Sequence, residues 1–533
     1  MKTTKKPSLN RLPKTKSPIG RPLLPNYKLS LFLGGLLAVS GCNSHKDEPS
    51  AKFEPSAQFP TIQLPSGYQI EKVVGNLTYP TSVTWDDKGR MYVAEAGGAF
   101  LEETPPARIL MIQDGKATEV ANLDQKGITA SVAGLTWYKG AFYFTHRAND
   151  FTGAVSRMTP DGTVTELFRG FIDSQTDHQL NDIRVGPDGR MYVASGLGGN
   201  SAVMGQDMTP FVVKNPSTHA TSAKDIVLTG QNFKMPNFLT TNVFGDTVLT
   251  GAFMPFGTET RPGQVIKASA RPGGSIMVFD PNNAAATLKP YAWGFRNVIG
   301  FAWNKQGEMF ATQNGYDVTP DRPVKDEYDP TYRVRENAWY GAPDFSAALE
   351  PLTDPKFQPP GSILAPVSIN GKRQPKKLGF VIDHQASGLT PPDKSLVLGL
   401  HEVDSSPSKP DVAPDSWGDM AGQLFVPEWG DLAPATNPLR DPPTGSKIVR
   451  INPSNGKVEP FIHNAMPGPA STQGATGRGI ERPFDVKFGP DGAMYIVDYG
   501  QALVVTRHIE HGHLPYEWPT NSGAIWKVTR TGK

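Results

Sequence analysis

The chain of 533 residues contains six copies of one short unit, a glycine turn followed at once by a strand of apolar and aromatic residues. The copies read GRMYVAEA from Gly89, GAFYFTHR from Gly140, GRMYVASG from Gly189, GEMFATQN from Gly307, GQLFVPEW from Gly422 and GAMYIVDY from Gly492. A unit that recurs in this way is typical of a repeat array, in which each unit buries its apolar face against its neighbours.

A second apolar strand runs into the glycine turn in five of the six copies. These strands read TSVTW, VAGLTW, NDIRV, VIGFAW and FDVKF, whereas the fifth copy has only the weaker segment SWGDMA. The turns WDDKG and GPDG between such strands are Asp-Gly hairpin signals. Because further apolar strands follow at similar offsets, each unit has about four strands. This pattern predicts an all-β fold, a six-bladed β-propeller of four-stranded blades.

The two ends of the repeat region are expected to meet. An open array would leave an unpaired strand edge. GYQIEKVV from Gly67 precedes the first full unit and GAIWKV from Gly523 follows the last one. We therefore expect this N-terminal strand to pair with the C-terminal strand in one shared blade.

The N-terminal segment has the features of an export signal. The first 28 residues hold eight Lys or Arg and no acid, and the apolar run Leu29 to Val39 follows. That run is too short to span a bilayer and ends in Val39-Ser40-Gly41-Cys42, which resembles a bacterial lipobox. The sequence predicts a lipoprotein signal peptide over 1–41, lipidation of Cys42, a flexible tether over 42–62 and the propeller over 63–533. The protein would then be lipid-anchored to a membrane, at the periplasmic side of the outer membrane.

Charge and cysteine content exclude several functions. Removal of residues 1–41 takes eight of the 53 basic residues, leaving 45 against 51 acidic residues and a formal charge of −6. The remaining chain has no excess of basic residues that would suggest a nucleic-acid partner. Cys42 is the only cysteine, so one molecule contains no disulfide, no cysteine-based metal site and no covalent c-type haem.

The propeller topology indicates where a site would form. The innermost strand of a blade and the next strand are antiparallel, so loops that enter the first and leave the second lie on one face, around the central channel. Polar residues occupy such loops, at Asp177 to Gln179, Arg296-Asn297, Arg482, Glu95, His146-Arg147, Asn200, Asn314 to Asp317 and Asp498. The segment 197–270 leaves the same face and is expected to wall the site. The sequence pattern does not assign the Pro-rich segment 335–415 to a place in the blades.

These residues do not all favour a functional role. His178 lies between Asp177 and Gln179 in a polar loop. Because no apolar strand pattern surrounds it, a functional role is favoured over a structural one. His146 ends an apolar strand and is more typical of a structural histidine. Glu95 and Asp498 have the alternative of capping turns.

Three segments match a known family. They read DHQLNDIRVGPDGRMYVASG from Asp177, AWGFRNVIGFAWNKQGEMFATQNG from Ala292 and ERPFDVKFGPDGAMY from Glu481. With these segments the chain resembles the soluble PQQ-dependent sugar dehydrogenases, also called glucose/sorbosone dehydrogenases, and the related pyranose dehydrogenases, which are six-bladed propellers.

The resemblance implies a quinoprotein that oxidises a sugar or polyol hydroxyl and passes electrons to an external quinone or cytochrome. His178 would be the general base and Arg296 would stabilise the developing oxyanion. Four residues would contact PQQ: Asn297, Arg482, Gln179 and Asn314. Main-chain oxygens of Gly315 and Tyr316, with Asp317, would hold Ca²⁺.

The chain departs from the family pattern at two positions. Phe484 stands where a second cofactor-binding arginine is expected, and Leu197 stands in place of an aspartate. Arg147 and Arg478 are candidates to complete the set of cofactor-binding cations.

Two other functions remain open. A calcium-dependent lactonase of the same shape would use acids and amides at the channel mouth, at Glu95, Asn200, Asp317 and Asp498. The second alternative is a non-catalytic propeller lipoprotein that binds a glycan or a protein, since a fold does not establish a function.

Overall fold

The computed structural model describes residues 52–531 apart from 99–104, 129, 241–245, 319–321, 361–366, 370–371, 375–377, 434, 438, 441–442 and 506–514. The chain divides into two compact units, 1–50 and 51–533, and only the second is described. The predicted signal peptide, Cys42 and most of the predicted tether lie outside the described residues. Within the described part, no helix is long and apolar enough to cross a membrane.

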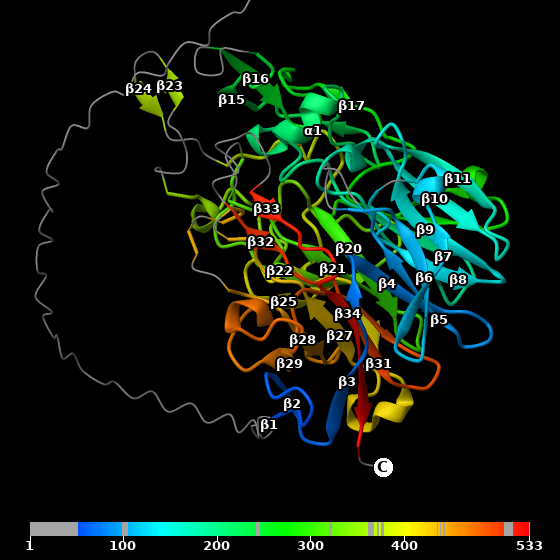
Figure 1. Ribbon diagram of the computed structural model, residues 1–533. Coiled ribbons are helices and arrows are strands. Elements are labelled where there is room, and N and C mark those ends of the chain that lie inside the picture. The colour runs from blue at the N-terminus through cyan, green and yellow to red at the C-terminus, as the bar shows by residue number, and fades with distance from the viewer. Residues whose placement is uncertain are drawn as a thin grey trace, which may run out of the picture. The chain divides into compact units, whose positions relative to one another are not determined.

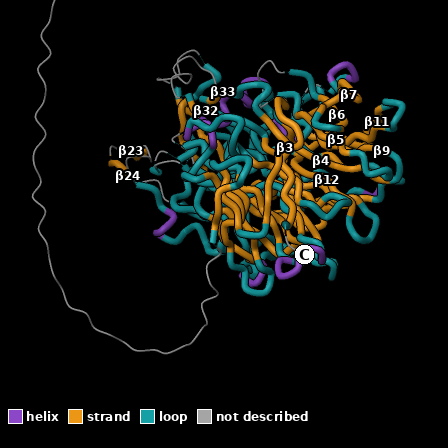
Figure 2. The backbone as a smooth tube through the Cα atoms, turned by 60° about the horizontal axis from the view of Figure 1, so that its bottom comes forward, coloured by secondary structure: helices purple, strands orange, loops and turns teal. Residues whose placement is uncertain are grey.

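The second unit is the predicted all-β, six-bladed propeller, and each blade is an antiparallel sheet with at least four strands (Figure 1). The first blade contains β4 (Pro80–Trp85), β5 (Met91–Glu95), β6 (Arg108–Gln113) and β7 (Lys116–Asn122). The second contains β8 (Leu135–Tyr138), β9 (Ala141–Arg147), β10 (Gly153–Met158) and β11 (Val164–Phe171). The third contains β12 (Leu180–Val185), β13 (Met191–Ser195), β18 (Ser275–Phe279) and β19 (Lys289–Trp293). Strands make up most of the body, and the few helices are short (Figure 2).

The other three blades contain strands that are far apart in the sequence. The fourth blade contains β20 (Asn297–Trp303), β21 (Met309–Asn314), β22 (Asp329–Val334) and β25 (Val397–His401). The fifth contains β26 (Asp411–Val412), β27 (Leu424–Glu428), β28 (Lys447–Ile451) and β29 (Val458–Asn464), and is extended by β2 (Ile62–Pro65) and β1 (Phe53–Pro55). The sixth contains β30 (Pro483–Phe488), β31 (Met494–Asp498), β34 (Gly523–Arg530) and β3 (Tyr68–Leu77). In the last of these blades β3 pairs with β34, from Tyr68 opposite Arg530 to Leu77 opposite Gly523.

The hairpins between first and second strands form as predicted. In the third blade, the Asp188 carboxylate accepts the main-chain N–H of Arg190 at 3.0 Å. Gly189 adopts a φ of +75°, in the left-handed region that an L side chain rarely occupies. Asp491 makes the same turn contact in the sixth blade, and in the first blade Asp86 accepts the N–H of Arg90, the residue after the turn glycine.

One strand prediction was wrong. SWGDMA does not form the innermost strand of the fifth blade, because residues Asp415–Met420 form turns of 3₁₀ helix in which Gly418 has a φ of +58°. The innermost strand is instead the two-residue β26, which pairs with β27 through Asp411 and Phe425. The preceding Lys409 bridges in parallel to Asp485 of the sixth blade.

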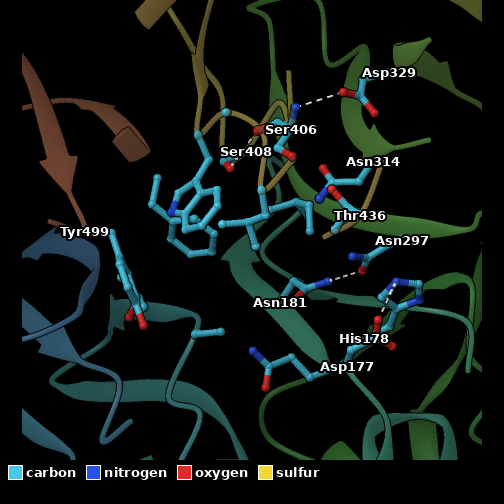
Figure 3. Close-up of a pocket in the computed structure, with 18 of the residues that line it drawn as sticks. Asp177, His178, Asn181, Asn297, Asn314, Asp329, Ser406, Ser408, Thr436 and Tyr499 are labelled. Carbon is cyan, nitrogen blue, oxygen red and sulfur yellow. Dashed lines mark hydrogen bonds and ion pairs between the residues drawn. The ribbon is translucent and has the colours of Figure 1, made fainter. Parts of the chain in front are cut away.

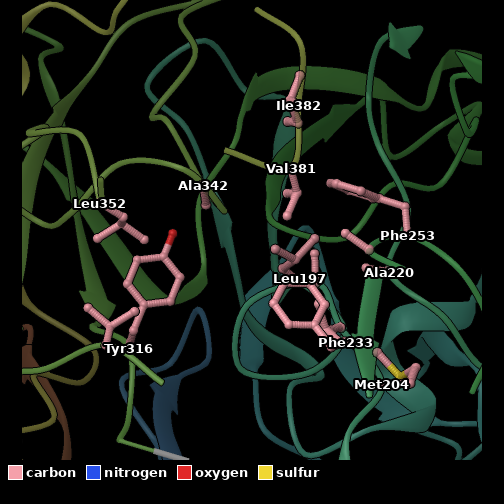
Figure 4. Close-up of a cluster of buried hydrophobic side chains, with 14 of the residues drawn as sticks. Leu197, Met204, Ala220, Phe233, Phe253, Tyr316, Ala342, Leu352, Val381 and Ile382 are labelled. Carbon is pink, nitrogen blue, oxygen red and sulfur yellow. The ribbon is translucent and has the colours of Figure 1, made fainter. Parts of the chain in front are cut away.

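Two insertions pack together into one core, as Figure 4 shows in part. The first lies between β13 and β18 and contains α1 (Thr209–Lys214), β14 (Ile226–Val227) with β17 (Val265–Ile266), and β15 (Asn232–Pro236) with β16 (Thr247–Gly251). The second spans 335–396 and includes β23 (Val367–Ile369) and β24 (Lys372–Gln374). The segment that the sequence left unplaced is therefore mainly an insertion between the third and fourth strands of the fourth blade.

A single carboxylate links the second insertion to the loop after β21. Asp344, fully buried, pairs with the buried guanidinium of Arg322 at 2.9 Å. The same carboxylate accepts the main-chain N–H groups of Val381 and Ile382 and lies 3.0 Å from Nε2 of His384. A buried charge must be paired and hydrogen-bonded in this way if it is not to destabilise the fold.

The innermost strands contact one another in a ring, β4 with β8, β8 with β12, and so on to β30, which contacts β4. Six charged side chains fill the centre of this ring, and we call them the axial charge network: Asp182, Arg184, Lys409, Asp411, Asp485 and Lys487. Arg184 lies 2.8 Å from Asp182 and 3.3 Å from Asp485. Three positive and three negative groups therefore balance where the blades meet.

Replacement of Arg184 by methionine should destabilise the propeller. It would leave two fully buried carboxylates, Asp182 and Asp485, without their main cationic partner, a loss that typically costs about 3–5 kcal/mol. Urea unfolding followed by tryptophan fluorescence measures the change. The matched control is Arg190→Met, at a solvent-exposed pair with Asp188, which should cost less than about 0.5 kcal/mol. Equal midpoints for the two variants would contradict the importance of the network.

Candidate functional site

A cavity of about 240 Å³ opens above the axial charge network. Its lining comes from loops that enter innermost strands and leave second strands, which is where the propeller topology predicts a site. Seven of the predicted site residues line it: His178, Gln179, Arg296, Asn297, Asn314, Gly315 and Asp317. Arg482 and Tyr316 do not, nor do Arg147 and Arg478.

His178 occupies one wall of the cavity and is only 3% exposed. Its Nδ1 lies 2.6 Å from the carbonyl oxygen of Leu197. Because a carbonyl can only accept, Nδ1 carries the proton in the neutral ring and Nε2 is left as an acceptor. Nε2 lies 3.7 Å from Oδ2 of Asp177.

Burial controls the protonation of this imidazole. It lowers the pKa of His178 to about 4, and the nearby Arg296 lowers it further, while Asp177 and the Leu197 carbonyl act in the opposite direction. The ring is therefore neutral at neutral pH. Gly196 permits the arrangement, since a Cβ at that position would lie 2.6 Å from the Cβ of His178.

The main chain of Leu197 connects the two residues predicted to be catalytic. Its carbonyl oxygen holds His178, and its N–H donates to the carbonyl oxygen of Arg296 at 2.7 Å. The Leu197 side chain lies in the core of the insertions (Figure 4). Although leucine replaces the aspartate of the family pattern, the backbone at this position orients the site.

Arg296 is buried and its charge is already paired. Nη2 lies 2.8 Å from Oδ2 of Asp317 and 2.9 Å from Oδ1 of Asn200, while Nε donates to the Asn200 carbonyl at 3.2 Å. Burial raises the pKa of Asp317, and Arg296 opposes this rise. The predicted calcium ligand Asp317 thus acts in this structure as the partner of the predicted oxyanion stabiliser.

The adjacent Asn297 belongs to a pair of amides. Its Oδ1 accepts from Nδ2 of Asn181 at 3.0 Å, and the same nitrogen donates to the carbonyl oxygen of Val298 at 2.8 Å (Figure 3). This contact joins the third and fourth blades at the cavity wall.

The predicted calcium loop is held by Asp329. The N–H of Gly315 donates to its Oδ1 at 2.6 Å, and Ser405 Oγ and the N–H of Ser406 donate to its Oδ2. The side chain of Tyr316 points into the core of the insertions (Figure 4), where its hydroxyl donates to the Phe345 carbonyl. Among the described residues, no group of three or more His, Cys, Asp or Glu is placed to hold a metal ion.

The structural alternatives are confirmed for three other residues. Glu95 accepts the N–H of Thr78 at 2.7 Å and pairs with Arg108. Asp498 accepts the N–H groups of two residues that precede β30. His146 has both ring nitrogens within 2.9 Å of oxygen atoms. Of the four residues proposed for a lactonase metal site, Asn200 and Asp317 hydrogen-bond to each other, whereas Glu95 and Asp498 are held by these other partners.

Aromatic side chains form the wall opposite His178, a feature that the sequence analysis missed. Trp429, Phe484, Tyr499 and Trp518 line the cavity and pack together. Figure 3 shows Tyr499 across the cavity from His178 and Asn297. The signal was present, because Trp429 and Tyr499 are the last residues of two of the six repeated units.

The cations predicted to bind cofactor carboxylates face the protein instead. Arg482 donates from Nη1 to the carbonyl oxygen of Asp431 at 2.7 Å, and its guanidinium lies over the ring of Trp429 at 4.6 Å. Arg478 donates from Nη2 to the carbonyl oxygen of Gly474 at 3.0 Å. Arg147 donates from Nε to a carbonyl oxygen at 2.9 Å.

The lining carries an excess of negative charge. Its acidic members are Asp177, Asp317, Asp329, Asp404 and Asp431, and its only Lys or Arg is Arg296. Such a set favours cations and hydrogen-bond donors, and it provides no free cation for a cofactor with several carboxylates. The residues that line this cavity do not fit the carboxylate groups of PQQ.

Comparisons with known proteins agree with the fold. A family model described as a domain of unknown function, DUF7133, matches residues 54–234. No curated protein matches the chain. Among solved structures, a Trichoderma reesei protein of carbohydrate-active enzyme family AA12 is 13% identical, covers 89% of this chain and 98% of its own, with a TM-score of 0.50.

Two quinoprotein structures are also similar. The PQQ domain of Coprinopsis cinerea pyranose dehydrogenase is 14% identical over 90% of this chain and 98% of its own, with a TM-score of 0.48. The PQQ-bound aldose sugar dehydrogenase of Streptomyces coelicolor is 14% identical over 87% and 99%, with a TM-score of 0.45. At these identities the similarity establishes the propeller fold alone.

The buried imidazole should make the protein sensitive to mild acid. Between pH 7 and pH 5 the unfolded histidine, with a pKa near 6.5, binds a proton that folded His178, with a pKa of about 4, does not. Stability therefore falls as pH falls, and this residue should contribute about 2 kcal/mol of that loss. Urea unfolding at both pH values should show a smaller loss for His178→Gln than for the wild type. A change to Gln at His463, outside the cavity, should leave the wild-type loss unchanged, and equal losses in all three proteins would contradict the assignment.

Proposed function

We propose that the cavity binds a sugar or polyol and that His178 removes the proton from one of its hydroxyl groups, as the general base of a sugar dehydrogenase. The observation that carries the proposal is the neutral, buried imidazole whose Nδ1 is fixed by Leu197 and whose Nε2 is left as an acceptor on the cavity wall. A base must have its lone pair at the reacting proton, and the Leu197 backbone selects the tautomer that leaves this lone pair on Nε2.

The neighbours of His178 assist this proton transfer. When Nε2 takes the hydroxyl proton, the ring becomes cationic in a site that disfavours charge. The carboxylate of Asp177, 3.7 Å from Nε2, and the Leu197 carbonyl on Nδ1 both stabilise that cation. The aromatic wall on the opposite side makes part of the lining apolar, and a low-dielectric surrounding strengthens such interactions.

Oxidation also requires a hydride acceptor. The resemblance implies PQQ with Ca²⁺ as this acceptor, and an external quinone or cytochrome as the carrier that takes the electrons onward. PQQ would supply an electrophilic quinone carbonyl. Since the lining does not fit its carboxylates, the chemistry assigned to this chain is limited to proton transfer at His178.

Loss of the base should remove turnover. With PQQ and Ca²⁺ added and dye reduction followed over a panel of aldoses and polyols, His178→Ala should lower kcat/KM by about 10²–10⁴-fold. His463→Ala is the matched control and should keep wild-type activity. Wild-type activity in His178→Ala would contradict the assignment of the base, and a wild-type protein that reduces no dye with any sugar would contradict the dehydrogenase. Release of acid from a lactone without an electron acceptor would favour the lactonase.

We further propose that the protein is exported and anchored through lipid on Cys42, as the N-terminal sequence predicts. In a bacterial host, the wild type should incorporate labelled palmitate and partition into the detergent phase of Triton X-114. Cys42→Ala should lose both properties, because it lacks the thiol that carries the lipid. Detergent partitioning unaffected by the substitution would contradict this anchor.

A further inference from the structure

The unpartnered polar atoms on the His178 side of the cavity are all acceptors. In the described chain, Oδ1 of Asp177, Oε1 of Gln179 and Oδ1 of Asn314 are buried without a hydrogen-bond partner. Nε2 of His178, a residue 3% exposed, lies 3.7 Å from the carboxylate of Asp177. A buried acceptor without a donor is costly. A ligand that brings several donors would therefore be favoured on this side of the cavity.

The negative charge of the lining is only partly balanced. Asp317 is paired with Arg296, but the hydrogen bonds to Asp329 come from neutral groups and that to Asp404 comes from Asn437. Burial, together with repulsion by Asp317 and Asp329, raises the pKa of Asp404 to about 7, with Arg440 opposing the rise. A positive group in the cavity would relieve this repulsion.

The aromatic wall already holds cations on its rings. The guanidinium of Arg482 lies 4.6 Å from the ring centre of Trp429, and the ammonium of Lys409 lies 4.9 Å from that of Phe484. The face of an aromatic ring attracts positive charge and also packs against the C–H groups of a saturated ring. Opposite the acceptors, this wall fits the C–H face of a saturated ring.

We propose that the preferred ligand of the cavity is a sugar or polyol with a protonated amino group. This inference rests on the proposed function, since it names the substrate class of the same site. An ammonium group supplies three donors, no acceptor and one positive charge, which matches the unpartnered acceptors and the charge of the lining. A sugar acid or a polycarboxylate supplies negative charge and acceptors, and the same residues disfavour it.

Calorimetric titration of the full-length protein in detergent, without cofactor, tests the proposal by binding alone. The probes are glucosamine, glucose, N-acetylglucosamine and glucuronate at pH 7 and about 20 mM salt. Glucosamine should bind about tenfold or more tightly than glucose. The neutral amide N-acetylglucosamine should lose this advantage, and glucuronate should bind most weakly. At about 200 mM salt the preference should decrease, as expected for charge recognition.

Two variants assign the preference to the cavity. Asp177→Asn should weaken glucosamine about fivefold or more and change glucose by less than about twofold, because it removes charge and keeps a polar side chain. The matched control, Asp188→Asn in a solvent-exposed hairpin of the same blade, should leave both affinities unchanged. Glucose or glucuronate binding as tightly as glucosamine, or an Asp177→Asn variant with an unchanged preference, would overturn the amino-sugar proposal alone. Failure of all four probes to bind would overturn the sugar site itself.

Discussion

The structure depends on the balance of charge at its axis. Six innermost strands meet around the axial charge network, and Arg184 of the third blade reaches Asp485 of the sixth across the centre. The cost of burying these groups is offset only while each charge keeps its partners. The network also supports the cavity from below, because the Lys409 ammonium donates to the carbonyl oxygen of Thr81, a cavity-lining residue.

On this base, the insertions fix the residues of the site. After β13, the main chain of Leu197 hydrogen-bonds to the His178 ring and to the carbonyl oxygen of Arg296. The chain then enters the core of the insertions. Asp344 links that core to the loop after β21, which carries Gly315 and Asp317. The orientation of the imidazole and the pairing of the arginine are therefore consequences of how the insertions pack.

The cavity combines residues that match the family resemblance with a charge distribution that does not match it. His178, Arg296 and Asn297 occupy one wall, as the family resemblance implies. The aspartates of the lining, Phe484 on the opposite wall and an Arg482 that faces the protein give the cavity a different electrostatic character. Position along the chain fixes which residues reach the channel mouth, whereas the balance of charge among them fixes which ligand is stable there.

The sequence by itself determined the blades and the place of the site. Apolar alternation and Asp-Gly turns such as Asp188-Gly189 act between residues that are close in sequence, so they could be read directly. The short β26 was missed, because its pairing depends on contacts with neighbouring blades and not on local pattern. Only the tertiary structure decided that Leu197 holds His178 through its backbone, that Arg296 is paired with Asp317, and that Trp429 and Tyr499 face the cavity. Each of these depends on distances between segments far apart in the chain, which no local pattern encodes.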